Sequence, residues 1–372
     1  LAMRIPIVIF IVYANIYAFY LEEGEFCEEQ NGVKGICRLY FNCSTAIKEV
    51  AANKRPKICS FEGLVPIVCC VEGNYSQRDK DSVLAALVNA WNLPTILPFD
   101  ENNLSLRKCR EFHTVKEDYP PFGFVGGINS LAKEFPHMAL LGYGDPNDIQ
   151  WECGGSLISE EFVLTAAHCL YSRLGGLKFI RLGELDLAST TDDADPQDFS
   201  VKQTYPHPNY TGISRYHDIA LVRLHQPARL TDYVKPACLA ITNNFTNTPA
   251  PQGMGWGLTS SGGNPANILQ HGYLRFIPVE DCQKIYGTSR DLKEGILDKI
   301  QICADGGDVV RDTCPGDSGG PLLMSNSRYR FTIFPEIVGV TAFGKDCGAV
   351  AGVYTRVLPY IPWIEKIVWP NS

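Results

Sequence analysis

The chain has 372 residues, of which 45% are apolar and 20% charged, a balance typical of a globular protein and not of a disordered one. This length is enough for two domains. The net charge of −8 and the lack of a dense Lys/Arg block argue against nucleic-acid binding, so we expect no nucleic-acid partner.

An apolar run from Ile5 to Leu21 follows a basic residue near the N-terminus. This pattern predicts a secretory signal peptide over residues 1–18. The run contains Pro6 and Asn15 and is short for a membrane span, although a retained anchor is the alternative. The fourteen cysteines, an even number, agree with an oxidising compartment. We therefore expect a secreted, extracellular protein that has no membrane partner.

Six cysteines lie within residues 27–70, a segment too small to be stable by its own core. They are Cys27, Cys37, Cys43, Cys59, Cys69 and Cys70. Spacing alone permits 15 connectivities. The adjacent last pair and the overall spacing resemble the clip domain of arthropod proteases, although defensin-like peptides have similar counts. The resemblance implies the pairs Cys27–Cys69, Cys37–Cys59 and Cys43–Cys70.

Residues 71–123 are predicted to be a linker and pro-region. The segment is polar from Glu72 to Asp81 and apolar from Val83 to Leu97. A short helix and a loosely ordered tether both fit the apolar part. Lys108 to Phe112 is similar to the segment that precedes the catalytic domain in snake-like clip proteases.

Short apolar segments bounded by Gly, Pro, Asn and Asp fill the chain from Phe124 to Leu358. Examples are Ser156 to Ala166 and Ile219 to Leu224, and the pattern predicts antiparallel β structure. Apolar residues at helical spacing from Pro362 to Val368 predict a C-terminal helix.

Three motifs in this region carry the residues of a catalytic triad. They are Leu164 to Cys169 around His168, His217 to Leu221 around Asp218, and Gly316 to Pro321 around Ser318. A serine hydroxyl needs a neighbouring base, imidazole suits that task, and a buried carboxylate can orient the imidazole. Taken singly, the motifs would be a surface turn, a core histidine and a strand-end cap.

Together, in the order His, Asp, Ser, the motifs resemble the chymotrypsin-like (trypsin-fold) serine endopeptidases. The resemblance implies a double six-stranded antiparallel β-barrel with a C-terminal helix over residues 124–372, preceded by the clip domain. It implies Ser318 as nucleophile, His168 as base and Asp218 as the residue that orients the base. The backbone N–H groups of Gly316 and Ser318 would form the oxyanion hole.

The resemblance also implies a substrate pocket. Asp312, six residues before Ser318, matches the pocket floor and would select Arg or Lys, while Gly344 and Gly352 match the pocket walls. Alternatively, Asp312 pairs with Arg311 in solvent. Ala342 stands where the family has a serine that supports the triad aspartate, so we expect weaker orientation of His168.

Phe124 to Gly127 resembles the activated N-terminus of the family. Cleavage after Gly123 would release an amine that inserts beside Asp317. Phe124 is bulkier than the usual Ile or Val, and Gly123 replaces the usual Arg or Lys. We therefore expect an activator with an elastase-like or otherwise unusual preference, or a conformational partner; a flexible turn at Gly126–Gly127 is the alternative.

The remaining eight cysteines match the pairs of the protease family. The implied bridges are Cys109–Cys238, Cys153–Cys169, Cys282–Cys303 and Cys314–Cys347. Through Cys109–Cys238, the clip domain would stay attached to the active enzyme. A chain with every cysteine bridged is the expectation.

Two further features concern the surface. Four sequons predict N-glycosylation, at Asn74, Asn103, Asn209 and Asn244; Asn42 is doubtful because its sequon contains Cys43. An acidic loop offers oxygen ligands for calcium from Glu184, Asp186, Asp193 and Asp195. The sequence favours a solvated acidic loop over a calcium site, and catalysis is expected to need no cofactor.

The resemblance implies a zymogen of an extracellular cascade in melanisation, Toll-type immunity or development. Its expected partners are downstream protease zymogens as substrates, an upstream activating protease and serpin-type inhibitors. A catalytically weak cofactor protein of the same fold and a venom protease are the two alternatives. The site before Phe124 and Ala342 favour the first alternative, and the clip domain argues against a digestive role.

Overall fold

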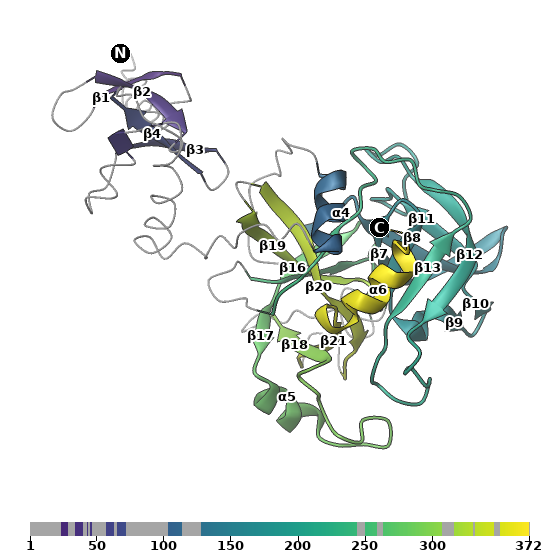
Figure 1. Cartoon of the computed structure of the whole chain (residues 1–372). Helices are drawn as coiled ribbons and strands as arrows, with labels where there is room; N and C mark the ends of the chain where they lie inside the picture. The colour runs from purple at the N-terminus through teal and green to yellow at the C-terminus, as the bar shows by residue number, and fades with distance from the viewer. Residues whose placement is uncertain are drawn as a thin grey trace, which may run out of the picture. The chain divides into compact units, whose positions relative to one another are not determined.

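The structure is a computed structural model of the whole chain (Figure 1). It describes residues 24–28, 34–39, 43, 45–46, 57–62, 65–71, 103–113, 128–243, 250–258, 263–306, 316–329, 332–345 and 350–371. The chain divides into a small unit within the region up to Pro98 and a large unit that begins at Phe99. In the described ranges, no helix is both long and apolar enough to span a membrane.

The small unit is an antiparallel sheet whose strands follow the order β1-β2-β4-β3. Its strands are β1 (Phe26–Glu28), β2 (Lys34–Leu39), β3 (Ile58–Glu62) and β4 (Val65–Cys70). Among its described residues, the buried core consists mainly of half-cystines, together with Ile67, Val68 and Ala46. Disulfides therefore take the place of the apolar core that so short a segment lacks.

The first half of the large unit is a closed antiparallel barrel in the order β11-β12-β13-β8-β7-β6. Its strands are β6 (Met138–Asp145), β7 (Asp148–Ser159), β8 (Phe162–Thr165), β11 (Phe179–Leu182), β12 (Gln197–Pro206) and β13 (Ala220–Leu224). The interior side chains, such as Leu141, Leu164 and Leu221, are at most 1% exposed. Closure leaves the six strands without a free edge.

The second half is a sheet that follows the path β17-β18-β21-β20-β19-β15-β16-β5. Its strands are β5 (Ile128–Asn129), β15 (Gln252–Gly255), β16 (Gln270–Tyr273), β17 (Arg275–Ile277), β18 (Gln301–Asp305), β19 (Pro321–Tyr329), β20 (Thr332–Phe343) and β21 (Gly352–Arg356). Only Leu274 separates β16 from β17, so the two pieces act as one interrupted strand. With that strand the path closes into a second ring of six, and β5 is added outside it.

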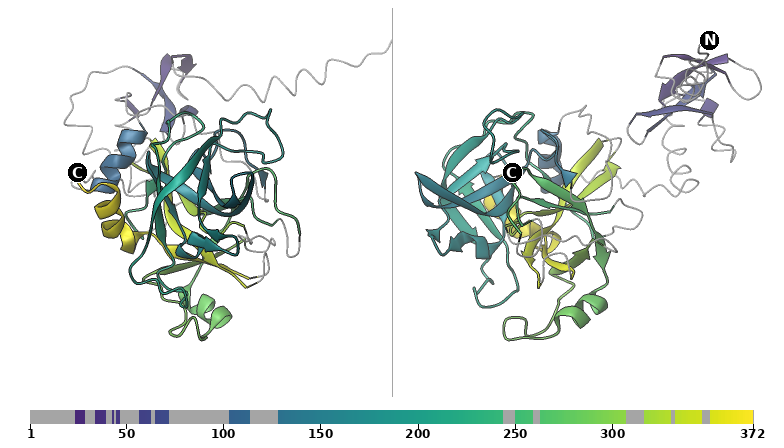
Figure 2. Two further views of the ribbon diagram at one scale, coloured as in Figure 1. Left: turned by 90° about the vertical axis from the view of Figure 1, so that its right-hand side faces the viewer. Right: turned by 180° about the vertical axis from the view of Figure 1, so that it is seen from behind.

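The predicted double six-stranded barrel with a C-terminal helix is therefore confirmed. Short helices accompany the barrels: α4 (Leu104–Phe112), α5 (Val279–Tyr286), the 3-10 turn η4 (Leu358–Tyr360) and α6 (Ile361–Val368). Helix α4 packs against α6 and against β14 (Cys238–Leu239), a two-residue strand beside β20. Figures 1 and 2 show α4 beside α6 in every view.

Candidate active site

The predicted base lies at the end of a buried strand. Strand β8 leads through Ala166 into the 3-10 turn η3 (Ala167–Leu170), which carries His168. A disulfide joins Cys169 to Cys153 on β7 and fixes this turn to the barrel. The His168 side chain is 34% exposed, so it is both held by the barrel and open to solvent.

The predicted acid comes from the neighbouring strand. Strand β13 pairs with β8 in the register Ala220↔Thr165, which brings Asp218 beside η3. Asp218 Oδ2 lies 2.7 Å from His168 Nδ1, and Oδ1 accepts the backbone N–H of His168 at 2.9 Å. The Asp218 side chain is only 6% exposed. A carboxylate bound at Nδ1 keeps the proton there and leaves Nε2 as the basic nitrogen.

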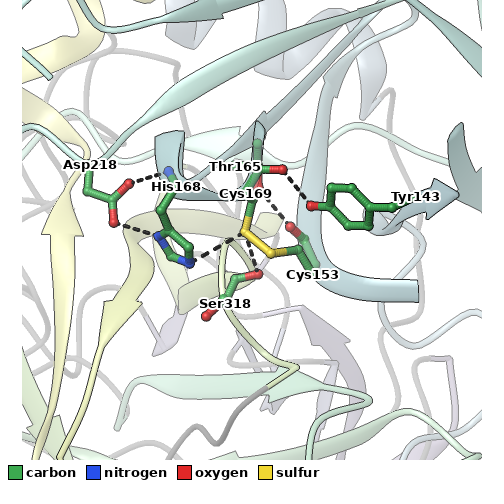
Figure 3. The surroundings of a disulfide bond; sticks show 8 residues. Tyr143, Cys153, Thr165, His168, Cys169, Asp218 and Ser318 are labelled. Atoms are coloured by element: carbon green, nitrogen blue, oxygen red, sulfur yellow. Dashed lines mark hydrogen bonds and ion pairs between the residues drawn. A yellow bond between two sulfur atoms is a disulfide. The ribbon is translucent and has the colours of Figure 1, made fainter. Parts of the chain in front are cut away.

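The predicted nucleophile sits on the turn between Gly316 and Gly320. Ser318 lies on the Nε2 side of the imidazole, across the ring from Asp218 (Figure 3). Its backbone carbonyl accepts the N–H of Gly154 at 2.7 Å, which ties the turn to β7. Gly319 has φ +79°, and a Cβ there would meet Thr165 Oγ1 and, at 2.5 Å, Gly154 O. Only glycine fits so close an approach to the first barrel.

Asp317, next to the nucleophile, is a buried carboxylate. It is 8% exposed, and its Oδ1 accepts the backbone N–H of Gly257 at 2.8 Å. A Cβ on Gly255 would meet Asp317 Oδ1, and one on Gly257 would lie 2.6 Å from it. The two glycines therefore make room for this carboxylate beneath the turn.

The departure at Ala342 leaves Asp218 with few donors. Ala342 lies in β20 and is 5% exposed. Within the described residues, His168 supplies both hydrogen bonds to the Asp218 carboxylate. Thr355 Oγ1 instead donates to the Asp218 backbone carbonyl at 2.9 Å. The orientation of the acid therefore depends on its backbone anchor and on His168 itself.

The pocket and activation residues are only partly described. Phe343 pairs with Val353, so Gly344 and Gly352 lie at the same end of the β20–β21 pair. Gly344 is exposed and Gly352 is buried. The predictions for Asp312, for the Cys314–Cys347 bridge, for Gly123 and Phe124, for the signal peptide, and for Asn74 and Asn244 lie outside the described residues.

Six disulfides join the cysteines of the described ranges, and none of those cysteines is free. In the small unit they are Cys27–Cys69, Cys37–Cys59 and Cys43–Cys70. In the large unit they are Cys109–Cys238, Cys153–Cys169 and Cys282–Cys303. These six pairings match the expected ones.

The two described sequons differ in their surroundings. Asn209 is exposed in the loop before β13. Asn103 is the N-cap of α4, and its Oδ1 accepts the N–H of Leu106 at 2.9 Å. Ser105, the third residue of that sequon, is 3% exposed and donates its hydroxyl to Glu365 at 2.7 Å.

The acidic loop does not gather its carboxylates around a common point. The four candidate ligands were Glu184, Asp186, Asp193 and Asp195. Arg181 lies 3.1 Å from Glu184, and Arg229 lies 3.0 Å from Asp195. Asp186 accepts a backbone N–H of its own turn, and Asp193 accepts the Tyr233 hydroxyl. In the described part of the chain, the clusters with metal-ligand spacing are three bridged cysteines of the small unit and His168 with the bridged Cys153 and Cys169.

An aromatic and histidine cluster behind Asp218 was not predicted. The rings of His207 and His217 stack with centroids 5.3 Å apart, and His217 Nδ1 lies 2.9 Å from the Tyr360 hydroxyl. Trp363 packs edge-on against His207. Burial lowers the pKa of His217, and burial together with His217 lowers the pKa of His207. The one available signal was that His217 immediately precedes Asp218.

A second unpredicted contact links two loops near the site. Arg215 Nε donates to Asp291 Oδ2 at 2.7 Å, and the guanidinium lies 4.9 Å from the centre of the Phe343 ring. The Ser289 hydroxyl and the Arg215 guanidinium hold the pKa of Asp291 at about 2. The loop before Asp218 is thereby fastened to the loop after α5.

The folded unit with a His–Asp–Ser site between two β-barrels defines a serine protease of the chymotrypsin type. Residues 124–364 match the family model described as Trypsin. The chain belongs to this family, and within it to the arthropod clip-domain serine proteases.

Three relatives support this assignment. Serine protease snk of Drosophila melanogaster is 36% identical over 94% of this chain and 80% of its own length. Phenoloxidase-activating factor 1 of Holotrichia diomphalia is 32% identical over 96% of each chain. CLIP domain-containing serine protease B4 of Anopheles gambiae is 38% identical over 66% of this chain and 70% of its own.

Proposed function

We propose that the protein is a secreted serine endopeptidase, made as a zymogen, that cleaves protein substrates after Arg or Lys in an extracellular cascade. Its substrates are downstream protease zymogens, an upstream protease activates it, and serpin-type inhibitors stop it. The observation that carries the proposal is the pair of hydrogen bonds between His168 and Asp218, at 2.7 and 2.9 Å. The names of the relatives, which include a phenoloxidase-activating factor, support the cascade role.

In the proposed reaction, His168 Nε2 takes the proton of the Ser318 hydroxyl as the oxygen attacks the substrate carbonyl. Asp218 stabilises the imidazolium that forms. The N–H groups of Gly316 and Ser318 donate to the carbonyl oxygen as its negative charge develops. His168 then gives the proton to the leaving amine, and water hydrolyses the acyl-enzyme by the reverse proton transfers.

Asp312 at the pocket floor would bind the cationic side chain that precedes the scissile bond. Gly344 and Gly352 would leave the pocket open, since neither carries a side chain. The adjacent positions of these glycines at one end of β20 and β21 are compatible with this role.

Activation would follow cleavage between Gly123 and Phe124. The new amine would pair with Asp317 and order the turn that carries Ser318. The buried position of Asp317 supports this role, because a buried carboxylate gains most from an added cation. Strand β5 pairs with β16 in the register Ile128↔His271, and Ile128 is only four residues after Phe124 in the sequence.

The test uses the full chain with the recognition sequence of a selective protease inserted directly before Phe124. After cleavage, hydrolysis of Arg, Lys, Leu and Phe peptides is measured beside a Ser318→Ala control. We expect hydrolysis of the Arg and Lys peptides that the control lacks. Equal turnover of Arg and Leu peptides would refute the proposed specificity.

The second candidate function is a cofactor or binding protein of the same fold with little catalysis. The buried Ala342 favours it, because it leaves the Asp218 carboxylate without a hydroxyl donor in the described residues. If the completely cleaved protein hydrolyses none of the four peptides, the cofactor or binding function becomes the better supported of the two.

A further inference from the structure

A small exposed hairpin directly follows the catalytic histidine. It consists of β9 (Tyr171–Ser172) and β10 (Gly175–Gly176), which pair only as Ser172↔Gly175 and Tyr171↔Gly176. Arg173 and Leu174 form its tip, and both are exposed. Tyr171 is 78% exposed and Leu174 is 45% exposed. This tip therefore presents an arginyl peptide bond to solvent.

Arg173 differs from most basic residues of the large unit because its side chain is free. No hydrogen bond or ion pair engages it within the described residues. Several other basic side chains of this unit have an acidic partner, as in Arg223–Glu161 and Lys284–Asp281. A free cationic side chain can enter a substrate pocket without first losing an ion pair.

Six other basic side chains of the described large unit also lack a hydrogen bond or ion pair: Arg107, Lys202, Arg290, Lys293, Lys299 and Lys366. Arg107 and Lys366 lie in the helices α4 and α6. Lys293 and Lys299 lie in the loop after α5, where the backbone N–H groups of Glu294 and Ile300 donate to the Tyr216 hydroxyl and the Leu297 carbonyl.

Lys202 lies within β12, whose strand is paired with β11 and with β13 on either side of that position. Arg290 precedes Asp291, which is bound to Arg215 through its side chain and through its backbone carbonyl. Entry of either segment into a protease would break barrel or loop contacts.

The Arg173 hairpin opens at a much lower cost. Around Gly175, a Cβ would have no atom within 4 Å, and around Gly176 its three nearest atoms belong to Leu170 and Tyr171. The first anchors on either side are Leu170 and Leu177, joined by a backbone hydrogen bond of 3.0 Å. Residues between them span about 20 Å when extended, so they can form a substrate strand while the barrel stays intact.

The disulfide pattern decides which pieces of the protein stay joined after a cut at this tip. Cys153 and Cys169 are the only cysteines from 124 to 173, and they bridge each other. The bridge that joins the pro-region to the catalytic unit uses Cys238, beyond the tip. When a chain that is already cut before Phe124 is also cut after Arg173, the segment 124–173 therefore has no covalent link to the rest. That segment carries β6, β7, β8 and His168.

We propose that an activated second copy of this enzyme cleaves the Arg173–Leu174 bond, and that this cut ends its activity. The inference rests on the proposed Arg/Lys specificity. Ser318 of the cutting copy forms an ester with the Arg173 carbonyl carbon as the Arg173–Leu174 bond breaks, and the Leu174 amine leaves with a proton from His168. Water then hydrolyses the ester, so one peptide bond and one water become a carboxyl group and an amine.

The cutting copy must be a second molecule, because the stem of the hairpin cannot thread through its own site. The Cys169 carbonyl accepts the Tyr143 hydroxyl at 2.5 Å, and Cys169 is bridged to Cys153. A bound substrate extends on both sides of the scissile bond. The residues before Arg173 cannot extend in this way while η3 holds His168 in place.

The test incubates the activated full chain and follows it by non-reducing denaturing gel, N-terminal sequencing and hydrolysis of an Arg peptide. We expect a new N-terminus at Leu174, release of the 124–173 segment without reductant, and activity lost in step. About tenfold dilution should lengthen the half-life about tenfold, because the step is bimolecular. A half-life that is independent of concentration would refute cleavage by a second copy.

Single variants test whether cleavage at Arg173, and not at another basic residue, causes the loss of activity. Arg173→Gln should keep its initial activity and lose it at least about tenfold more slowly, whereas Lys202→Gln and Arg290→Gln should decay like the parent chain. Ser318→Ala should be cut at Arg173 when active enzyme is added. Equal decay of Arg173→Gln and the parent would overturn the proposal.

Digestion by an unrelated protease tests the accessibility of the hairpin independently of the proposed enzymatic activity. Limited digestion of Ser318→Ala by an unrelated Arg-specific protease should cut first at Arg173 within residues 128–243. A first cut elsewhere in that range would overturn the accessibility of the hairpin whatever the enzyme's own activity. A chain that hydrolyses no Arg peptide would instead refute the proposed function, and self-cleavage with it.

Discussion

At the scale of single residues, Asp218 receives an unusually concentrated set of contacts. Its carboxylate takes two hydrogen bonds from one residue, His168, and its carbonyl takes one from Thr355. The backbone before it adopts φ +56° at His217, a region that is uncommon for residues other than glycine, although Asn, Asp and His are enriched there. The orientation of the imidazole therefore depends on a short segment that is held by its backbone.

Asp218→Asn should lower kcat for an Arg peptide by about 10⁴-fold, because an amide cannot stabilise the imidazolium and favours the wrong tautomer. KM should change little, since Asp218 is not expected to touch the substrate. The assay compares the activated variant with the activated parent. A loss smaller than about tenfold would mean that Asp218 does not orient the base in this chain.

Gly319→Ala should abolish most activity and lower Tm. The new methyl group would lie 2.5 Å from Gly154 O, and φ +79° adds a further cost of about 1–2 kcal/mol. Movement of the turn would displace the Ser318 N–H, whose loss as an oxyanion donor alone costs at least about 100-fold.

Gly212→Ala is the matched control for this change. Gly212 has φ +72°, but a Cβ there meets nothing within 4 Å, so only the backbone cost remains. We expect a small drop in Tm and full activity. Equal loss of activity in both variants would show that the close approach at Gly319 has no special role.

At the scale of elements, the cluster behind Asp218 couples the loop before β13 to the C-terminal helix. His207 and His217 come from the loop, Tyr360 from η4 and Trp363 from α6. Burial raises the pKa of Tyr360, and the charge of Asp218 raises it further. Asp218, Arg215 and Tyr210 are further charged or titratable groups of this region, and burial raises the pKa of Tyr210 to about 12.

The two histidines should make stability fall in mild acid. Their folded-state pKa values lie below the unfolded value of about 6.5, so between these values the unfolded chain binds more protons. Their contribution is complete above about pH 6.5 and is lost as the pH falls toward the folded-state values. Thermal unfolding at neutral and mildly acidic pH measures this loss.

The double variant His207→Gln, His217→Asn should lose less Tm between the two pH values than the parent. Asn is chosen at 217 because it tolerates the positive φ there. His225→Gln, outside the cluster, should lose as much as the parent. A double variant that loses as much Tm as the parent would contradict the prediction.

The sequence predicts the barrels, the triad positions and the cysteine pairs because each depends on local pattern or on a family motif. It does not predict contacts between distant loops. Arg215 and Asp291 are 76 residues apart, and Ser105 and Glu365 are 260 apart. Neither pair has a local signature, because only the tertiary fold brings its two residues together. In the acidic loop, Arg229 reaches Asp195 from 34 residues away, whereas Arg181 and Glu184 are only three residues apart.

At the scale of the whole molecule, the contacts of α4 bear on whether the pro-region would stay with the catalytic unit after the proposed activation cleavage. The Cys109–Cys238 disulfide supplies the covalent link. Three other contacts act beside it: Glu365 accepts both the N–H and the hydroxyl of Ser105, Leu106 is 4% exposed, and His113 Nε2 lies 2.9 Å from the Pro236 carbonyl oxygen. The helix therefore has a docked position that does not depend on the bridge alone.

With Cys109→Ser and Cys238→Ser, the activated protein should separate into two pieces on a denaturing gel but elute together under native conditions. Adding Glu365→Ala should weaken the docking about 10- to 100-fold, because hydrogen bonds to a charged acceptor are worth about 1.5–3 kcal/mol. The two pieces should then separate on dilution in size-exclusion chromatography. Lys366→Ala, an exposed change on the same helix, should leave them together. If the two pieces separate as soon as the disulfide is removed, the disulfide alone holds the pro-region to the catalytic unit. The contacts of α4 then contribute no measurable binding of their own.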